Sequence, residues 1–307
     1  GFQTRQHLPG LQQIIDHLRC GRFTESCLWA DVFDDLVGNE PLAQMVCESL
    51  HGRPPPGFSA LAFLDLANTL ARSLRLDRHP FDTAEGHARL RDWLTDAVAP
   101  WNGRSAAAAL PFISGVDQVE LLMMALAHPH AAVRLEALWA AARLGDGAAM
   151  DDLLAAAADP LRAGAAIAYL QELDAVHRLP PTVYDPVFQA QVTMVEWLSA
   201  PSEFGEPPVE IRLVAERRLF WPPVGAERTL RVLRFAYESE AGREEFVGVV
   251  GGMTAALIGE TDPGMAVEDI LGLHCCHELE RRSDPRAPAE RSAATGRLLI
   301  GLDNTGF

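Results

Sequence analysis

Apolar residues recur at helical spacing through the middle of the chain and at alternate positions closer to its end. The clearest helical copies are LLMMALAHPHAAVRLEALWAAARLGD and DDLLAAAADPLRAGAAIAYLQELD, which span 121–146 and 151–174. Each copy has an apolar helix, a His-Pro or Asp-Pro corner, and a second helix of small residues that carries an arginine. Apolar positions three to four residues apart form one helical face. The pattern predicts helical pairs that bury these faces by stacking on neighbouring pairs.

Prolines mark the corners of this pattern. Four of them stand near the ends of successive apolar segments, at spacings of 29, 31 and 26 residues: Pro100, Pro129, Pro160 and Pro186. Proline fixes φ and lacks an N–H donor, so it suits the first turn of a helix or the residues just after its end. A repeat of about 30 residues with this content is typical of an α-solenoid.

The segment HPHAAVRLEALWAAARLGD, residues 128–146, resembles a HEAT repeat of the short bacterial kind that also occurs in phycobilisome lyases. The resemblance implies an α-solenoid over the middle third of the chain. HEAT-like proteins include scaffolds, bilin lyases, DNA glycosylases and a di-iron hydroxylase. The hydroxylase class carries several His-Glu pairs on its repeats, whereas this chain has one, His277-Glu278, outside them. The acidic repeat region disfavours a DNA glycosylase.

Three regions follow from these patterns. Residues 1–92 predict irregular helices that cap the solenoid, and 93–204 predict the HEAT-like repeats. Residues 207–307 predict a small α+β domain, an antiparallel meander followed by a helix, because alternating apolar positions appear there for the first time. The fold class is therefore mainly α, with a C-terminal α+β domain.

Within the last region, alternation predicts strands at 209–216, 230–237 and 246–254, and the helical pattern returns at 266–282. The glycines of GVVGG, residues 248–252, fall inside the third predicted strand and open no helix. We interpret them as a bulge or a close approach of backbone, and not as a phosphate-binding loop.

The negative net charge of the chain limits the kinds of partner that it can bind. The chain of 307 residues has a net charge of −16, and 121–174 holds three arginines against seven acidic residues. Nucleic acid is disfavoured as a partner, because phosphates are neutralised by clustered cations. We expect a protein or peptide partner, and the acidic surface favours a basic one. No apolar run approaches the roughly 20 residues of a membrane span.

All 26 basic residues are arginine, which excludes lysine Schiff bases, lysine nucleophiles and a Walker-type lysine. Strong GC bias of a genome and selection against lysine both account for the missing lysine. Five cysteines without disulfide spacing fit a reducing compartment. No secretion signal is evident in GFQTRQHLPGLQQIIDHLRC, so we expect a cytoplasmic, bacterial protein.

Three aromatic residues are candidate binding residues. Phe220 and Trp221 close a strand before a double proline, where they could line a ligand or peptide groove or seal a domain junction. Trp139 projects from its helix toward a neighbouring helix or a groove. Arg134 and Arg162 occupy similar places early in the second helices, and we expect each to hydrogen-bond a carbonyl or carboxylate of the adjacent turn.

LHCCHELE, residues 273–280, is the densest cluster of metal-ligand side chains. His274 and His277 are three residues apart with Glu278 beside them, but the spacing fits neither a zinc finger nor His-Glu-x-x-His. We therefore prefer a packed helix with buried thiols to a metal site. We predict no cofactor and no catalytic residue.

We expect a non-enzymatic interaction or scaffolding protein whose solenoid binds a partner. An alternative is a lyase or chaperone-like enzyme that acts on a bulky apolar ligand where the solenoid meets the C-terminal domain. Cys275, His274 and His277 are its natural candidates. A second alternative is a secretion-system accessory or toxin-neutralising protein.

Overall fold

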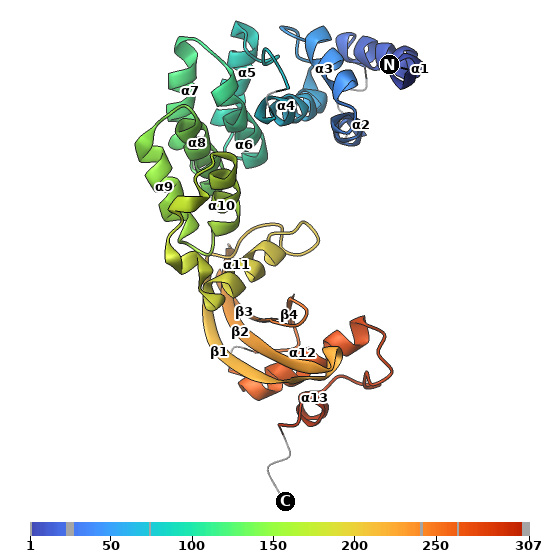
Figure 1. The fold of residues 1–307 in the computed structure, drawn as a ribbon, viewed down its shortest axis with the longest axis vertical. Coiled ribbons are helices and arrows are strands. Elements are labelled where there is room, and N and C mark those ends of the chain that lie inside the picture. The colour runs from blue at the N-terminus through green and yellow to red at the C-terminus, as the bar shows by residue number, and fades with distance from the viewer. Residues whose placement is uncertain (1, 23–27, 74, 240–241, 263, 303–307) are drawn as a thin grey trace, which may run out of the picture. The chain divides into compact units, whose positions relative to one another are not determined.

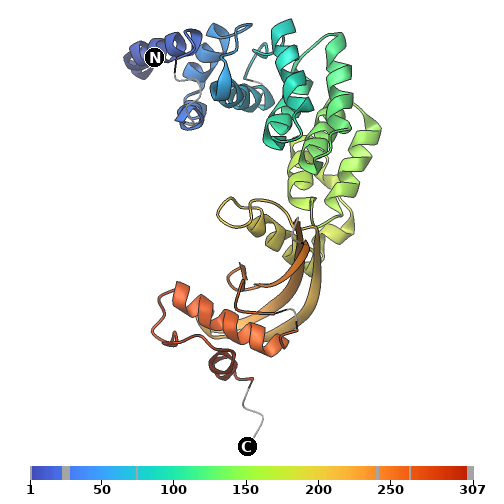
Figure 2. The ribbon, with the colours of Figure 1, turned by 180° about the vertical axis from the view of Figure 1, so that it is seen from behind.

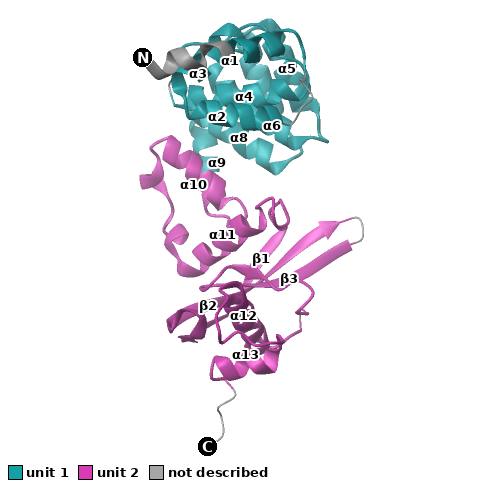
Figure 3. Cartoon of the chain, turned by 90° about the vertical axis from the view of Figure 1, so that its right-hand side faces the viewer, with its two compact units in different colours: residues 1–153 teal, residues 154–307 magenta. Residues whose placement is uncertain are grey.

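The computed structural model describes residues 2–22, 28–73, 75–239, 242–262 and 264–302, and it is mainly helical with one small antiparallel sheet (Figure 1). The chain divides into two compact units, 1–153 and 154–307 (Figure 3). In the described part of the chain, every helix is too short or too polar to cross a membrane.

The first unit is helical throughout. Its helices are α1 (Phe2–Arg19), α2 (Leu28–Val37), α3 (Glu40–Ser49), α4 (Gly57–Arg72), α5 (Ala84–Thr95), α6 (Pro100–Ala109), α7 (Val116–Leu126) and α8 (Ala131–Arg143), followed by the start of α9 (Gly147–Ala157). Helix α5 packs on α6 and α7 on α8, while α6 contacts α4 and α8, and α5 contacts α7. Fully buried alanines on α6 and α8, Ala106, Ala107, Ala137 and Ala140, allow these two helices to approach closely.

The prolines stand where helices begin or turn, as predicted. Pro100 and Pro186 occupy the first turns of α6 and α11 (Pro186–Leu198), and Pro129 and Pro160 lie in the connections before α8 and α10 (Ala163–Glu172). The side chain of Asp185 accepts hydrogen bonds from two backbone N–H groups of α11, which caps its first turn.

The two repeat arginines also behave as predicted. The Arg134 guanidinium donates to the carbonyl oxygen of His128 over 2.7 Å, and Arg162 Nε donates to Asp159 Oδ2 over 2.8 Å. Both arginines tie the start of a helix to the corner that precedes it.

The second unit joins α10 and α11 to a sheet and two further helices (Figure 2). Its strands are β1 (Glu210–Trp221), β2 (Ala226–Ser239), β3 (Gly242–Val250) and β4 (Ala255–Ala256), and its last helices are α12 (Val267–Arg281) and α13 (Ala293–Leu299). The strands pair in the order β1-β2-β3-β4, each antiparallel to the next. The predicted antiparallel meander and the helix after it are therefore present.

A β-bulge in β1 lets this strand contribute side chains to both cores of the sheet. Leu213 pairs with Leu233 but Ala215 pairs with Val232, so Val214 is an extra residue on β1. Before the bulge, Ile211 and Leu213 pack with α11. After it, odd-numbered residues of β1 point to the other face, where Leu219 and Trp221 pack with α12. A simple alternation across the whole strand would have put these side chains on one face.

Helix α11 belongs with the sheet. The sequence patterns group it with the repeats in 93–204, but Met194 and Leu198 are fully buried against β1, β2 and β3. Gly248 makes room for it, because a Cβ at that position would lie 2.6 Å from Met194 Cε. The compact unit that contains α11 and the sheet spans residues 154–307.

The GVVGG segment is a close approach of backbone, as predicted. Gly251 has φ +125°, and a Cβ there would lie 2.1 Å from the carbonyl oxygen of Thr229. Only glycine fits this conformation and this spacing.

Candidate functional site

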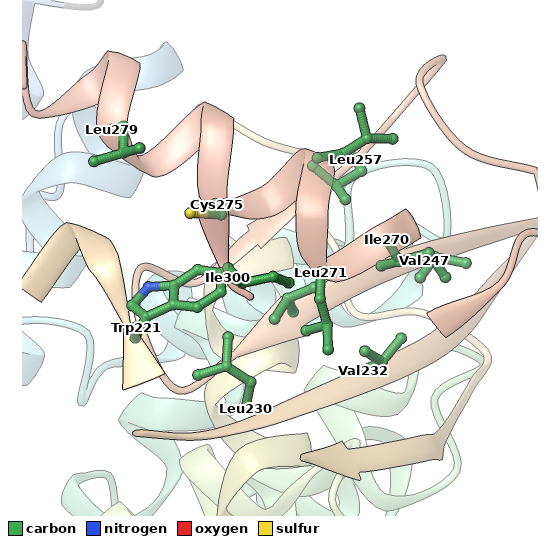
Figure 4. Packing of buried hydrophobic residues seen from close by; sticks show 12 residues of the cluster. Trp221, Leu230, Val232, Val247, Leu257, Ile270, Leu271, Cys275, Leu279 and Ile300 are labelled. Atoms are coloured by element: carbon green, nitrogen blue, oxygen red, sulfur yellow. The ribbon is translucent and has the colours of Figure 1, made fainter. Parts of the chain in front are cut away.

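Two candidates of the second unit, Trp221 and Cys275, lie in the core between the sheet and α12 (Figure 4), and a third, His274, is also fully buried. The Trp221 side chain is fully buried, and its indole N–H donates to Glu278 Oε2 over 2.8 Å. Phe220, the preceding residue, points the other way and is 56% exposed. Only Phe220 of this aromatic pair is placed to meet a ligand.

Glu278 is a fully buried carboxylate with a complete set of donors. Its Oε2 also accepts from the backbone N–H of Met253 over 3.0 Å, and its Oε1 accepts from Arg282 Nε over 2.9 Å. Burial alone would raise the pKa of Glu278, but the hydrogen bonds from Met253, Trp221 and Arg282 outweigh it and hold the pKa below its usual value. Through its hydrogen bonds with Trp221 and Met253, Glu278 connects α12 to the end of β1 and to the turn after β3.

The two histidines of α12 do not converge on one point. The His274 ring is fully buried and stacks on Trp221 with centroids 5.7 Å apart, and burial lowers its pKa to about 4. His277 lies at the surface side of the helix, where its Nδ1 is 2.7 Å from Arg291 Nη1. Among the residues that the structure describes, no three or more His, Cys, Asp and Glu side chains are grouped to hold a metal ion.

The Cys275 thiol is equally enclosed. It is fully buried, and burial raises its pKa to about 12. A thiol of this kind is a poor nucleophile, because thiolate is the reactive form. His274 and Cys275, two of the three candidates of the lyase alternative, are therefore packed in the core, and the third, His277, is half-buried.

Trp139 is also fully buried, on α8 of the first unit. The Arg72 guanidinium lies 3.9 Å from the centre of its ring, a cation–π contact. Trp139 is thus not itself a surface for a ligand. It supports Arg72, and Arg72 lines a pocket.

This pocket is a candidate site in the described part of the first unit. It has a volume of about 380 Å³ and lies among α4, α6 and α8. Nine residues line it: Asp65, Asn68, Thr69, Arg72, Trp101, Arg104, Ser105, Ala108 and Glu136. We call it the α4/α6/α8 pocket. Its size is in the range of pockets that hold small molecules or single side chains.

At the floor of the pocket, the buried carboxylate of Glu136 on α8 contacts one arginine from α4 and one from α6. The Glu136 side chain is 2% exposed, its Oε1 contacts Arg72 Nη2, and its Oε2 accepts from Arg104 Nε over 3.2 Å. Arg72 is held between this carboxylate and the Trp139 ring. The Arg72 guanidinium is thus held on two sides, while the more exposed Arg104 reaches the same carboxylate from α6.

The neutral polar side chains Asn68 and Thr69 of the pocket hydrogen-bond to other groups of the protein. His79, whose pKa burial lowers to about 3, accepts from the Phe81 backbone N–H at Nδ1, so its Nε2 carries the proton and donates to Asn68 Oδ1. The Asn68 amide then donates to the carbonyl oxygen of Ser105 over 2.9 Å. The Thr69 hydroxyl donates to the Asp65 carbonyl oxygen.

The rim of the pocket is accessible. Trp101 is 63% exposed and the Arg104 side chain is 56% exposed, both on α6, and Asp65 is exposed on α4. A large exposed aromatic side chain beside a cation is a common feature of binding surfaces.

Sequence patterns did not single out Arg72, Arg104 and Glu136, which stand up to 64 residues apart. One signal was available. Glu136 lies three residues after Val133 and four before Ala140, so it shares their buried face, and a carboxylate on such a face needs a partner. The partners come from other helices, and a single sequence does not identify them.

No protein-family model, no curated protein and no solved structure matches this chain.

Proposed function

We propose that this chain is a non-enzymatic interaction protein that binds a partner polypeptide at the α4/α6/α8 pocket. The observation that carries the proposal is the pocket itself, an accessible hollow with a fixed charged floor and the exposed Trp101 at its rim. Such a surface supplies an aromatic anchor and charged groups already held in position, so little side-chain entropy is lost on binding.

The chemistry of the pocket favours binding over catalysis. Each oxygen of Glu136 engages an arginine, and the Thr69 hydroxyl donates to a carbonyl, so neither group is placed to act as a base or a nucleophile. The groups that could contact a ligand are the exposed Trp101 ring, the Arg104 guanidinium and the Asp65 carboxylate.

A HEAT-like arrangement of the helical pairs is part of the proposal. The packing of α6 on α4 and α8, and of α5 on α7, supports it, as does the burial of small residues between α6 and α8. In such an arrangement α4, α6 and α8 form one row of helices, and the pocket opens within this row. The cytoplasmic location and the basic partner expected from the net charge stay predictions, as does an accessory role in secretion or toxin neutralisation.

A photo-crosslinking residue placed at Trp101 tests the proposal in the cells that make the protein. We expect one covalent partner from this position and none from the same residue at Val116, which is 91% exposed on α7 and serves as the control. Trp101→Ala should also release the partner in quantitative affinity purification. Identical crosslinks from both positions, or no partner that depends on Trp101, would refute binding at the pocket.

A further inference from the structure

We propose that the outer edge of β1 pairs with the same edge of a second copy of this chain, antiparallel and centred on Arg217. This surface belongs to the second unit, so the inference is independent of the pocket and its partner. β1 is an outer strand of the sheet (Figure 1): it pairs with β2 on one side, and no strand in the described part of the chain pairs with its other side. An unpaired strand edge is a surface on which another strand can add through main-chain hydrogen bonds.

Two side-chain contacts identify the backbone groups of β1 that point outward. The carbonyl oxygen of Ile211 accepts from Gln191 Nε2 over 3.4 Å, and that of Glu216 accepts from Arg217 Nη1 over 3.1 Å. Both carbonyls therefore point away from β2, and those of every second residue after Glu216 do the same, because backbone groups alternate in direction along a strand. Within the described residues, the outward N–H groups of Glu216 and Arg218 have no acceptor.

The order of charges after the bulge makes this edge self-complementary. With Arg217 of the two copies opposite each other, Glu216 lies opposite Arg218 of the second copy, and Arg218 lies opposite its Glu216. Each of these facing pairs can exchange both N–H···O bonds of an antiparallel ladder. A shift of two residues in either direction would set Glu216 opposite Glu216 or Arg218 opposite Arg218, and facing like charges are destabilising. The charges therefore select one register.

The ion pairs within each sheet are compatible with this register. Glu216 Oε2 lies 2.7 Å from Arg231 Nε, and Arg218 Nη2 lies 2.7 Å from Glu227 Oε2. Addition of a second β1 extends these pairs into a row of alternating sign, from Glu227 and Arg218 of one copy to Glu216 and Arg231 of the other. Each charge of the row then has neighbours of opposite sign.

Arg217 opposes the pairing, because it meets its own copy on the other face of the sheet. Glu268 Oε1 lies 3.3 Å from Arg217 Nη2 within each copy, so each guanidinium brings its own counterion. Arg228 adds a further positive charge to this face of β2, and two chains of net charge −16 repel each other. At about 150 mM salt, repulsion over more than roughly 8 Å is largely screened, whereas the facing pairs lie within that distance.

The bulge limits the length of the pairing. Bulges and charged side chains protect strand edges from non-specific pairing, and here they leave residues 215–219 to pair in one register. At each end of this segment Phe220, which is 56% exposed, lies beside Val214 of the second copy, which is 37% exposed. Mutual burial of these apolar side chains favours association. We therefore expect a reversible dimer with two-fold symmetry.

Sedimentation equilibrium of the full chain at about 150 mM salt measures the pairing. Glu216→Arg and Arg218→Glu should each raise the dissociation constant of the dimer at least about tenfold, because each sets like charges opposite each other at two places. The double variant restores opposite charges between the copies but not within the sheet, so recovery of the dimer identifies the contact between copies. Glu244→Arg, exposed on β3, changes the net charge as Glu216→Arg does and should leave the dissociation constant unchanged.

Arg217→Cys tests the register. The two copies of residue 217 form a non-hydrogen-bonded pair with Cα atoms about 4.5 Å apart, which is within reach of a disulfide. Mild oxidation should link two chains through position 217, as peptide mass spectrometry would show, whereas Glu244→Cys on β3 should give no bond at its new thiol. A wild-type chain that stays monomeric up to about 0.1 mM would overturn the inference, as would a dimer without the bond at position 217 or a double variant no tighter than the single ones.

Discussion

Replacement of Glu278 by alanine tests how the second unit is held together. The substitution removes the acceptor of the buried indole N–H of Trp221, of the half-buried backbone N–H of Met253 and of the half-exposed Arg282. A hydrogen bond to a charged group contributes roughly 1.5 to 3 kcal/mol, and loss of one partner of a buried charged pair costs about 3 to 5 kcal/mol. Loss of the Arg282 contact adds little to the destabilisation, because water can hydrogen-bond this half-exposed side chain instead. Water that enters the space left by the Glu278 carboxylate reduces the loss further. We expect Glu278→Ala to lower the free energy of unfolding of this unit by about 4 kcal/mol.

The two compact units can unfold separately, so one global unfolding free energy is not well defined. Native-state hydrogen exchange read by mass spectrometry resolves them. Peptides from β2 and α12 should lose about 4 kcal/mol of opening free energy, and peptides from α6 and α8 should not change. Glu227→Ala is the matched control, since it breaks an exposed 2.7 Å pair with Arg218 in the same sheet and should cost less than about 0.5 kcal/mol. A loss of under about 1 kcal/mol in Glu278→Ala, or one equal to the control, would refute the reasoning.

Three further predictions follow from the same structure. The pKa of His274 is lowered from 6.5 to about 4, so the unfolded state takes up the proton first as the pH falls. His274 should therefore contribute about 3 kcal/mol to the free energy of unfolding above pH 6.5, and this contribution should be lost between pH 6.5 and 4. His274→Phe should flatten this pH dependence in urea titrations followed at α12. Gly251→Ala should lower the opening free energy of the second unit by roughly 3 kcal/mol in hydrogen exchange, because both the φ of Gly251 and the Thr229 carbonyl exclude a Cβ. Gly225→Ala is the control: Gly225 has φ +65° but open space around it, so this substitution should lower the opening free energy by about 1 kcal/mol. Glu136→Ala should destabilise the first unit by about 3 kcal/mol, because it removes the buried carboxylate that Arg72 and Arg104 contact, and a thermal melt that matches the wild type would contradict the role of the pocket floor.

The local features of the fold were predictable from sequence. Alternation identified the strands, and a helical pattern at 266–282 matches α12 closely. Pro100 and Pro186 marked helix starts because their constraint on the backbone is local. The close approach of backbone at Gly251 was also predictable, since a glycine inside a strand pattern indicates a close approach or a bulge.

Features set by distant residues were not predictable. The packing of α11 on the sheet brings together side chains that are distant in sequence, such as Met194 over Gly248, which are 54 residues apart in the chain. Alternation shows that Phe220 and Trp221 point to opposite faces, but the bulge at Val214 decides which of them is buried. The pocket floor joins side chains of three helices, and the charged partners of Glu136 could not be chosen among 26 arginines.

The bulge in β1 also links the folding of the two cores of the second unit. One continuous strand supplies Ile211 and Leu213 to the core with α11, and Leu219 and Trp221 to the core with α12. The backbone hydrogen bonds between β1 and β2 therefore serve both cores at once. If α11 or α12 separates from the sheet, the β1–β2 hydrogen bonds that support the other helix are weakened. The second unit should therefore unfold in one cooperative transition.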